Sequence, residues 1–244
     1  MRFGIAVRRG RAFVSNTARH LRAGHPLRES TRYFWPWWES LASGRSPLDD
    51  EIPWICFSAI DFLYTALRPD MTVFEYGTGG STLFWARRVR QVYAVEHDRA
   101  WYERVRDVVM KQGCRNVDLR LCEPTVAVGN IDSPASLDGF ASGDMIYHGY
   151  SFETYVRSIE SFPDHSFDVV LIDGRARPAC FAHAHPKLRP GGYLILDNPE
   201  RPHYYSVHDT LRCAGWPCFE FHGPVPSIPN FSETTIWVKS GRIR

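Results

Sequence analysis

The chain has 244 residues, of which 44% are hydrophobic and 23% are charged, and its formal net charge is +2. This balance is typical of a folded globular protein and argues against a disordered chain or a membrane bundle. No apolar run approaches the ~20 residues that span a bilayer, and no secretory signal pattern is present. The six cysteines include no C-x-x-C pair. We therefore expect a cytoplasmic protein with reduced thiols and no structural zinc.

The basic residues are concentrated at the beginning of the chain. Residues 1–32 contain eight arginines and one acid, so the remaining chain has 21 basic and 26 acidic residues. Because this larger part is acidic, we expect no nucleic-acid partner. The basic arm has the spacing of an amphipathic helix. Its predicted apolar stripe consists of Phe3, Val7, Gly10, Val14, Ala18 and Leu21.

The predicted stripe needs an apolar cover. We expect it to pack on its own domain or on a second subunit, which would make the protein a homo-oligomer, because Gly4 and Gly10 weaken a free-standing helix. The alternative is an anionic membrane surface that attracts the arginines beside the stripe.

An aromatic segment, Tyr33–Trp38, follows the arm, and Pro36 is expected to interrupt it. A loop is predicted over residues 43–53. We divide the chain into a helical arm with an aromatic-rich linker over residues 1–49 and a catalytic domain over residues 50–244. Four tryptophans near this boundary could form a lid over a substrate or attach the arm to the domain. They are Trp35, Trp37, Trp38 and Trp54.

Strand and helix patterns alternate from residue 54 onward. In chain order, we predict a helix over 54–67, a strand over 72–76, a helix over 81–90, a strand over 91–95, a helix over 99–111 and a strand over 116–122. Residues 125–149 are polar and without period, which indicates a long loop or insertion. A helix over 152–162, a strand over 167–172, a helix over 178–188, a turn over 189–192 and a strand over 193–196 follow. The last predicted elements are a helix over 205–214 and strands over 218–222 and 234–238.

This alternation predicts an α/β protein with a doubly wound, Rossmann-like, mostly parallel seven-stranded sheet. The last two strands are expected to form an antiparallel hairpin at the edge of the sheet.

The most informative segment joins the first predicted strand to its helix. Glu75 lies at the strand's end, Gly77 and Gly79 form a turn, and Ser81 begins the helix. Glycines let the backbone approach a ligand closely, and free N–H groups at a helix start favour an anionic group. A second acid, Glu96, ends the next strand, where a carboxylate can accept both hydroxyls of a ribose. The segment therefore predicts a site for a nucleoside-containing ligand.

The identity of that nucleoside depends on Glu75. The dinucleotide fingerprint requires a third glycine, but Thr82 stands at that position. A carboxylate two residues before Gly77 would repel a pyrophosphate, whereas it could orient the ammonium group of an amino acid. A ligand that combines a ribose with a cationic amino-acid tail is S-adenosylmethionine.

The sequence here resembles the class I S-adenosylmethionine-dependent methyltransferases. Residues 75–79 match their E-x-G-x-G motif, Glu96 matches their second-strand acid, residues 167–174 match their fourth-strand motif, and residues 188–192 match their L-x-P-G-G turn. The resemblance covers residues 70–240. It implies a methyltransferase that holds its cofactor through Glu75, Gly77, Thr78, Gly79, Ser81, Glu96 and Asp173.

A narrower resemblance concerns a divalent cation. The catechol and caffeoyl-CoA type O-methyltransferases bind such an ion through an aspartate after the fourth strand and an Asp-Asn pair after the fifth. Asp173, Asp197 and Asn198 are similar to those ligands, and their oxygens suit Mg²⁺. Against this interpretation, Pro199 directly follows the pair, and aspartates at these strand ends also occur in the wider class without a metal.

Asp173, His148 and His203 are the candidate catalytic residues, because all three are expected near the carboxyl edge of the sheet. The predicted reaction is methyl transfer to a small-molecule acceptor, with oxygen favoured over nitrogen as the nucleophile. Two alternatives remain open. One is a catalytically idle methyltransferase-like module that binds a partner, and the other is a nicotinamide-dependent oxidoreductase.

Overall fold

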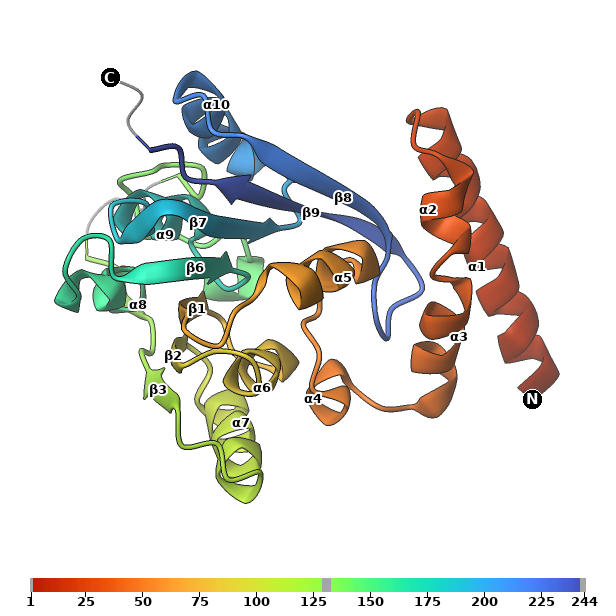
Figure 1. Ribbon diagram of the computed structural model, residues 1–244, viewed down its shortest axis with the longest axis horizontal. Coiled ribbons are helices and arrows are strands. Elements are labelled where there is room, and N and C mark those ends of the chain that lie inside the picture. The colour runs from red at the N-terminus through yellow and green to blue at the C-terminus, as the bar shows by residue number, and fades with distance from the viewer. Residues whose placement is uncertain (1, 129–132, 242–244) are drawn as a thin grey trace.

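The computed structural model describes residues 2–128 and 133–241, with side chains from residue 7 onward. A seven-stranded sheet crosses the molecule, with helices on both of its faces (Figure 1). Successive residues of a strand point to opposite faces. Phe74 and Tyr76 accordingly pack in one hydrophobic cluster, whereas Val73 packs in another on the opposite face. The sheet is thus buried on both sides, as a parallel sheet requires.

The strand order is β3-β2-β1-β6-β7-β9-β8. Each pairing among the first five strands is parallel, whereas β9 runs antiparallel to both β7 and β8. This arrangement confirms the predicted fold and the antiparallel hairpin at its edge. The strands are β1 Thr72–Tyr76, β2 Gln91–Glu96, β3 Val117–Leu121, β6 Phe167–Ile172, β7 Leu188–Asp197, β8 Cys218–Pro224 and β9 Phe231–Val238.

The helices divide between the two faces. One face packs against α5 Phe57–Ala66, α6 Gly80–Ala86 and α7 Arg99–Lys111. The opposite face packs against α8 Glu153–Arg157, which continues as a 3₁₀ turn over Ser158–Ser161, together with α9 Arg177–Ala184 and α10 Tyr205–Cys213.

Two predicted elements differ from the structure near prolines. Strand β7 begins at Leu188, because residues 189–192 form an irregular extension of the strand rather than a separate turn. Pro36 lies in the first turn of helix α3 Phe34–Ser43, where a missing backbone N–H costs no helical hydrogen bond. The expected interruption at Pro36 is therefore wrong.

The insertion that follows β3 begins and ends in short paired strands. These are β4 Thr125–Val126 and β5 Tyr150–Ser151, which pair antiparallel. A 3₁₀ turn, Met145–Tyr147, precedes β5. The predicted loop of residues 125–149 is confirmed between these strands, except at residues 129–132, which lie outside the described chain.

The N-terminal arm lies beside the hairpin (Figure 1). It comprises α1 Arg2–Arg22 and α2 Leu27–Thr31, which lead into α3 and into α4 Pro47–Asp50. The side chains of α1 that are buried against the protein are Phe13, Asn16 and His20.

The buried face of α1 is not the predicted stripe. Val14 is 68% exposed, and Val7 and Leu21 also face solvent, so the expected packing of these residues on their own domain is wrong, whereas a second subunit or a membrane surface as their cover stays a prediction. The side chain of Phe3 lies outside the described part. Phe13 faces inward, because its ring packs against Phe34, Trp37 and Phe231, with ring centroids 4.8, 5.1 and 5.4 Å away.

Within residues 2–128 and 133–241, no helix combines the length and the hydropathy that crossing a bilayer requires.

Candidate active site

A cavity of about 1020 Å³ opens at the carboxyl ends of the central strands. This is the edge at which doubly wound sheets bind ligands, because the strand order reverses there. The turn after β1 and the ends of β2, β6 and β7 form its floor. Three separate segments complete its wall: Gly44–Leu48 before and within α4, Ile146–Tyr147 of the insertion, and residues of the loop between β8 and β9.

The glycine turn requires glycine at Gly77. Its φ of 89° lies in the left-handed region, and a Cβ there would lie 3.0 Å from the Cα of Gly174. The turn after β1 therefore packs directly on the turn after β6. This contact brings the glycine turn and Asp173 to the same cavity, as the sequence predicted.

Glu75 lies behind this turn rather than on the cavity. It is fully buried, accepts a hydrogen bond of 2.6 Å from the Thr82 hydroxyl, and lies 3.2 Å from the indole Nε1 of Trp85, which donates to it. Thr82 Oγ1 in turn accepts the N–H of Gly79 at 3.1 Å. Burial raises the pKa of Glu75 to about 8. In this arrangement Glu75 fixes the glycine turn through Thr82, a role that the sequence interpretation missed.

Glu96 occupies the predicted position at the end of β2 and lines the cavity. One carboxylate oxygen accepts the N–H and the hydroxyl of Thr78 at 3.0 and 2.9 Å, and the other accepts the N–H groups of His97 and Asp98 at 2.7 and 3.0 Å. Burial favours the neutral form, but these bonds and the adjacent His97 outweigh it and lower the pKa of Glu96. A buried carboxylate therefore faces the cavity in its charged form.

Two further residues on this side were not assigned to the site from sequence. Trp101 lines the cavity, and its indole donates a 2.7 Å hydrogen bond to the Thr78 carbonyl. His97 also lines the cavity, with Nδ1 2.7 Å from a Glu96 oxygen. The only sequence signal for both is their nearness to Glu96, within five residues.

The opposite side of the cavity contains a cluster of two acids and one base. Asp173, after β6, and Asp197, at the end of β7, both lie close to Arg177 from the first turn of α9. An Arg177 nitrogen lies 2.9 Å from Asp173 Oδ1, and another lies 4.0 Å from Asp197 Oδ2. Burial raises the pKa of both carboxyl groups, more strongly for Asp197, whereas the Arg177 charge opposes the shift.

These contacts bear on the predicted metal ligands. Asp173, Asp197 and Asn198 do lie on one cavity. However, Arg177 already supplies a fixed positive charge to both carboxylates, and the Asn198 amide donates a 2.9 Å hydrogen bond to Ser232. Asp197 Oδ1 also accepts the Thr234 hydroxyl at 2.9 Å. One oxygen of each carboxylate is thus engaged by Arg177 or Thr234, and the guanidinium charge beside both carboxylates opposes the binding of a divalent cation.

The predicted catalytic histidines are not brought to this cluster. His148 is exposed on the insertion, and His203 lies near Gly143, with neither among the residues that line the cavity. The other predicted cofactor residues, Thr78, Gly79 and Ser81, do line it.

No protein-family model matches the sequence, and no curated protein matches it. Solved structures do share its fold. The crystal structure of the O-methyltransferase TomG from Streptomyces achromogenes, which is involved in tomaymycin synthesis and is in complex with S-adenosylmethionine, aligns with a TM-score of 0.54 at 18% identity, over 83% of this chain and 90% of that chain.

Two further structures align with lower TM-scores. An rRNA methylase from Streptococcus thermophilus has a TM-score of 0.47 at 14% identity, over 81% of this chain and 99% of that chain. An O-methyltransferase from Bacillus cereus has a TM-score of 0.48 at 19% identity, over 69% of this chain and 74% of that chain. The strand order and the alignment with TomG show that this chain has the fold of the class I S-adenosylmethionine-dependent methyltransferases.

Proposed function

We propose that the protein is an S-adenosylmethionine-dependent methyltransferase that methylates an oxygen of a small-molecule acceptor. One observation carries this proposal: the charged carboxylate of Glu96, the glycine turn and Asp173 all line one cavity. Its volume of about 1020 Å³ is at the upper end of the ~300–1,000 Å³ typical of ligand pockets. That leaves room for a small acceptor beside a nucleoside cofactor.

The cofactor would be held on the side of the cavity formed by β1 and β2. Glu96 would accept the ribose hydroxyls, with one of them taking over the place of the Thr78 hydroxyl. The backbone of Gly77 and Gly79 would face the methionine portion, and Trp101 offers an aromatic surface beside the turn. Bound there, S-adenosylmethionine supplies a methyl group that is already activated for transfer.

The acceptor would lie on the side formed by Asp173 and Arg177. Methyl transfer requires alignment, exclusion of water and removal of one proton. Asp173 is the proposed proton acceptor, because it lines the cavity and burial raises its pKa above that of a free aspartate. Arg177 would keep its side chain in place through the 2.9 Å contact.

We propose further that Arg177 makes a divalent cation unnecessary. The guanidinium holds Asp173 and Asp197 in one cluster, which is the positioning role that a cation would otherwise have. Methyl transfer should therefore continue in excess chelator. Loss of activity in chelator, restored by Mg²⁺, would instead assign the three predicted ligands to a metal.

The cytoplasm is the proposed location. This rests on the six cysteines, all of which are free thiols in the structure, as expected in a reducing compartment.

The proposal is tested by calorimetric titration with S-adenosylhomocysteine and, separately, with NAD. A methyltransferase should bind the first and not the second, and should transfer a labelled methyl group to some member of a panel of small hydroxylated compounds. Binding of NAD alone would favour an oxidoreductase. Binding of neither would favour an idle module.

A further inference from the structure

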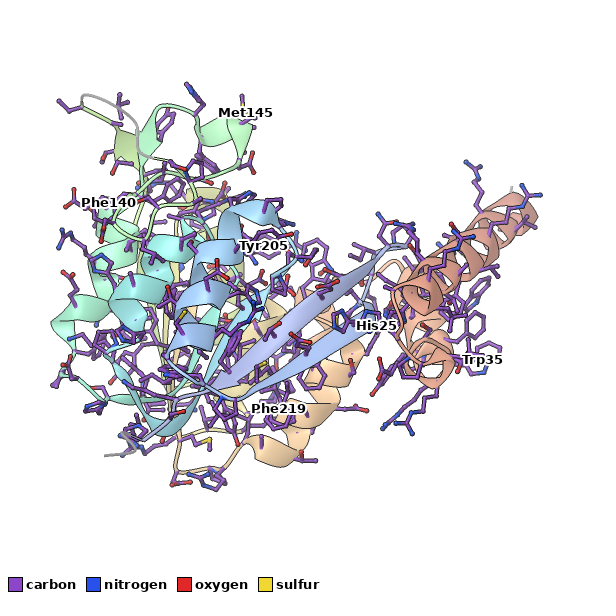
Figure 2. All side chains as sticks on the ribbon, turned by 90° about the horizontal axis from the view of Figure 1, so that it is seen from above. His25, Trp35, Phe140, Met145, Tyr205 and Phe219 are labelled. Carbon is purple, nitrogen blue, oxygen red and sulfur yellow. The ribbon has the colours of Figure 1, made fainter. Side chains whose placement is uncertain are left out.

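Three histidines gather where the arm meets the β8–β9 hairpin, away from the cavity described above. His20 comes from α1, His25 from the connection to α2, and His222 from β8. The ring of His25 lies between the other two, with centroids 4.3 Å from His20 and 3.9 Å from His222. Figure 2 shows His25 in the space between the arm and the hairpin. Glu29 of α2 completes the group on the arm side.

Three of these residues offer metal-ligand atoms at close range. One ligand atom from each of His20, His25 and Glu29 lies within 4.8 Å of the other two. Around a tetrahedral zinc with bonds of about 2.0–2.1 Å, ligand atoms are about 3.4 Å apart. His25 and Glu29 are only partly buried, so their side chains have room to close this difference. Two imidazoles and one carboxylate form a ligand set that suits zinc.

The imidazole of His20 is oriented with one ring nitrogen toward Glu29. Its side chain is only 7% exposed, and its Nδ1 lies 2.6 Å from the Ser30 hydroxyl. Its Nε2 is buried without a hydrogen-bond partner and faces Glu29, whose carboxylate oxygen is 4.0 Å away. A buried polar nitrogen without a partner is costly. A ring nitrogen held by an outer partner while the other faces a ligand group is the usual arrangement of a metal-bound histidine.

The charge state of His20 agrees with this geometry. Burial, with the neighbouring His25 and His222, lowers the pKa of His20 to about 4. Its imidazole is therefore neutral at neutral pH, which is the form that binds a metal.

We propose that His20, His25 and Glu29 form a zinc site, with water as the fourth ligand. The ion would join the end of α1 to α2. Because His25 packs on His222, it would also brace the hairpin whose loop forms part of the cavity wall.

The test is a calorimetric titration of the chelator-treated, full-length protein with zinc. One zinc should bind per chain and raise the melting temperature. His25→Ala and Glu29→Gln should each weaken zinc binding at least tenfold and reduce the rise in melting temperature, whereas His183→Ala, outside the cluster, should bind as wild type does. Cobalt should give the visible absorption of a four-coordinate ion in the wild type but not in His25→Ala.

Two outcomes would overturn the proposal. One is the absence of a bound zinc. The other is wild-type affinity in both His25→Ala and Glu29→Gln, with loss of binding when Cys213 and Cys218 are replaced by serine, which would assign the metal to the exposed thiols.

Discussion

Glu96 links two tasks in one carboxylate. It accepts four hydrogen bonds from Thr78, His97 and Asp98, and it also faces the cavity. The backbone around the site is therefore held by the same carboxylate that is proposed to bind the ribose. Removing Glu96 should weaken both the local backbone structure and cofactor binding.

Glu96→Ala should weaken the binding of S-adenosylhomocysteine by ~1.5–3 kcal/mol, the range for hydrogen bonds to a charged group. Thr78→Val is the matched control, because it removes a hydroxyl bonded to Glu96 but leaves the carboxylate facing the cavity. Calorimetry on both folded variants makes the comparison. Equal affinity in Glu96→Ala and wild type would place the ribose elsewhere.

The raised pKa of the buried Glu75 carboxyl group leads us to expect that the free energy of unfolding depends on pH. Burial raises its pKa from 4.5 to about 8, so the folded protein retains this proton over a range in which the unfolded chain has lost it. The stabilisation is fully present below about pH 4.5 and is lost as the pH rises through about 8. At ~1.4 kcal/mol per pKa unit, the loss between pH 5.5 and 8.5 is at most ~3 kcal/mol.

Glu75→Gln should remove this part of the pH dependence, because the amide does not titrate. Denaturant unfolding of both proteins at pH 5.5 and 8.5 measures it. Parallel pH profiles for the two proteins would show that Glu75 is ionised in the fold at both pH values.

Local motifs made some residues of the site predictable. Gly77, Gly79 and Glu96 were singled out from strand ends and turn chemistry, and the structure has all three on the cavity. Arg177 was not predictable, because its meeting with Asp197 spans 20 residues and depends on how α9 packs beside β7. His203 was predicted near the site because it follows the end of a strand, but its side chain does not line the cavity.

At the scale of elements, two tryptophans on either side of the predicted domain boundary hold the β8–β9 loop. The Trp37 indole donates a 2.8 Å hydrogen bond to the Ile228 carbonyl, and the Trp54 indole donates one of 2.8 Å to the Pro226 carbonyl. Trp37 is fully buried, whereas Trp54 is half exposed and lines the cavity. Both indoles thus attach their segments to the hairpin loop, and a lid over a substrate stays a prediction for Trp54.

Trp37→Phe should lower the free energy of unfolding by ~1–3 kcal/mol, because it removes volume at a fully buried position and leaves the partly buried Ile228 carbonyl without its donor. Trp35→Phe is the control, since Trp35 is 67% exposed and such surface changes usually stay within about 0.5 kcal/mol. Denaturant unfolding measures both. Equal losses would mean that the indole bond contributes nothing specific.

Element types were more predictable than element limits. Every strand of the main sheet was predicted, because short apolar runs between turn residues are strong signals. The expected helix over 81–90 ends at Ala86 instead, and α3 was not predicted. The start of α6 does depend on tertiary packing: a Cβ at Gly80 would lie 2.1 Å from the Pro47 carbonyl, so this end of the helix is fixed by a segment distant in sequence.

At the scale of the whole molecule, the arm is the part whose role is least defined by the fold. Phe13 fixes it to the hairpin, and the Asn16 amide donates a 2.9 Å hydrogen bond to the Pro229 carbonyl. Its apolar residues Val7, Val14 and Leu21 are exposed to solvent. We propose that a second subunit or an anionic membrane covers them. The division of the chain near residue 50 also stays a prediction, although Gly44–Leu48 already line the cavity.

Deletion of residues 1–28 should lower the melting temperature, because it exposes the apolar surface that Phe13 covers. Phe13→Ala alone should cost ~3 kcal/mol, whereas Val14→Ser should change stability little. Scanning calorimetry measures these effects, and sedimentation with anionic vesicles is done in parallel. Vesicle binding that the deletion abolishes, with stability unchanged, would make the arm a membrane anchor.

The pairing of β4 with β5 at the base of the insertion bears on how the protein can evolve. Thr125 pairs with Ser151 and Val126 with Tyr150, so the chain leaves the core and returns to it at neighbouring points. A segment joined in this way can be lengthened, shortened or exchanged without moving the strands on either side. Ile146 and Tyr147 of that segment line the cavity, and the Tyr147 ring packs on His97 beside Glu96, with centroids 5.2 Å apart. Exchange of the segment would therefore reshape the cavity wall next to Glu96 while the strands that carry the site stay in place.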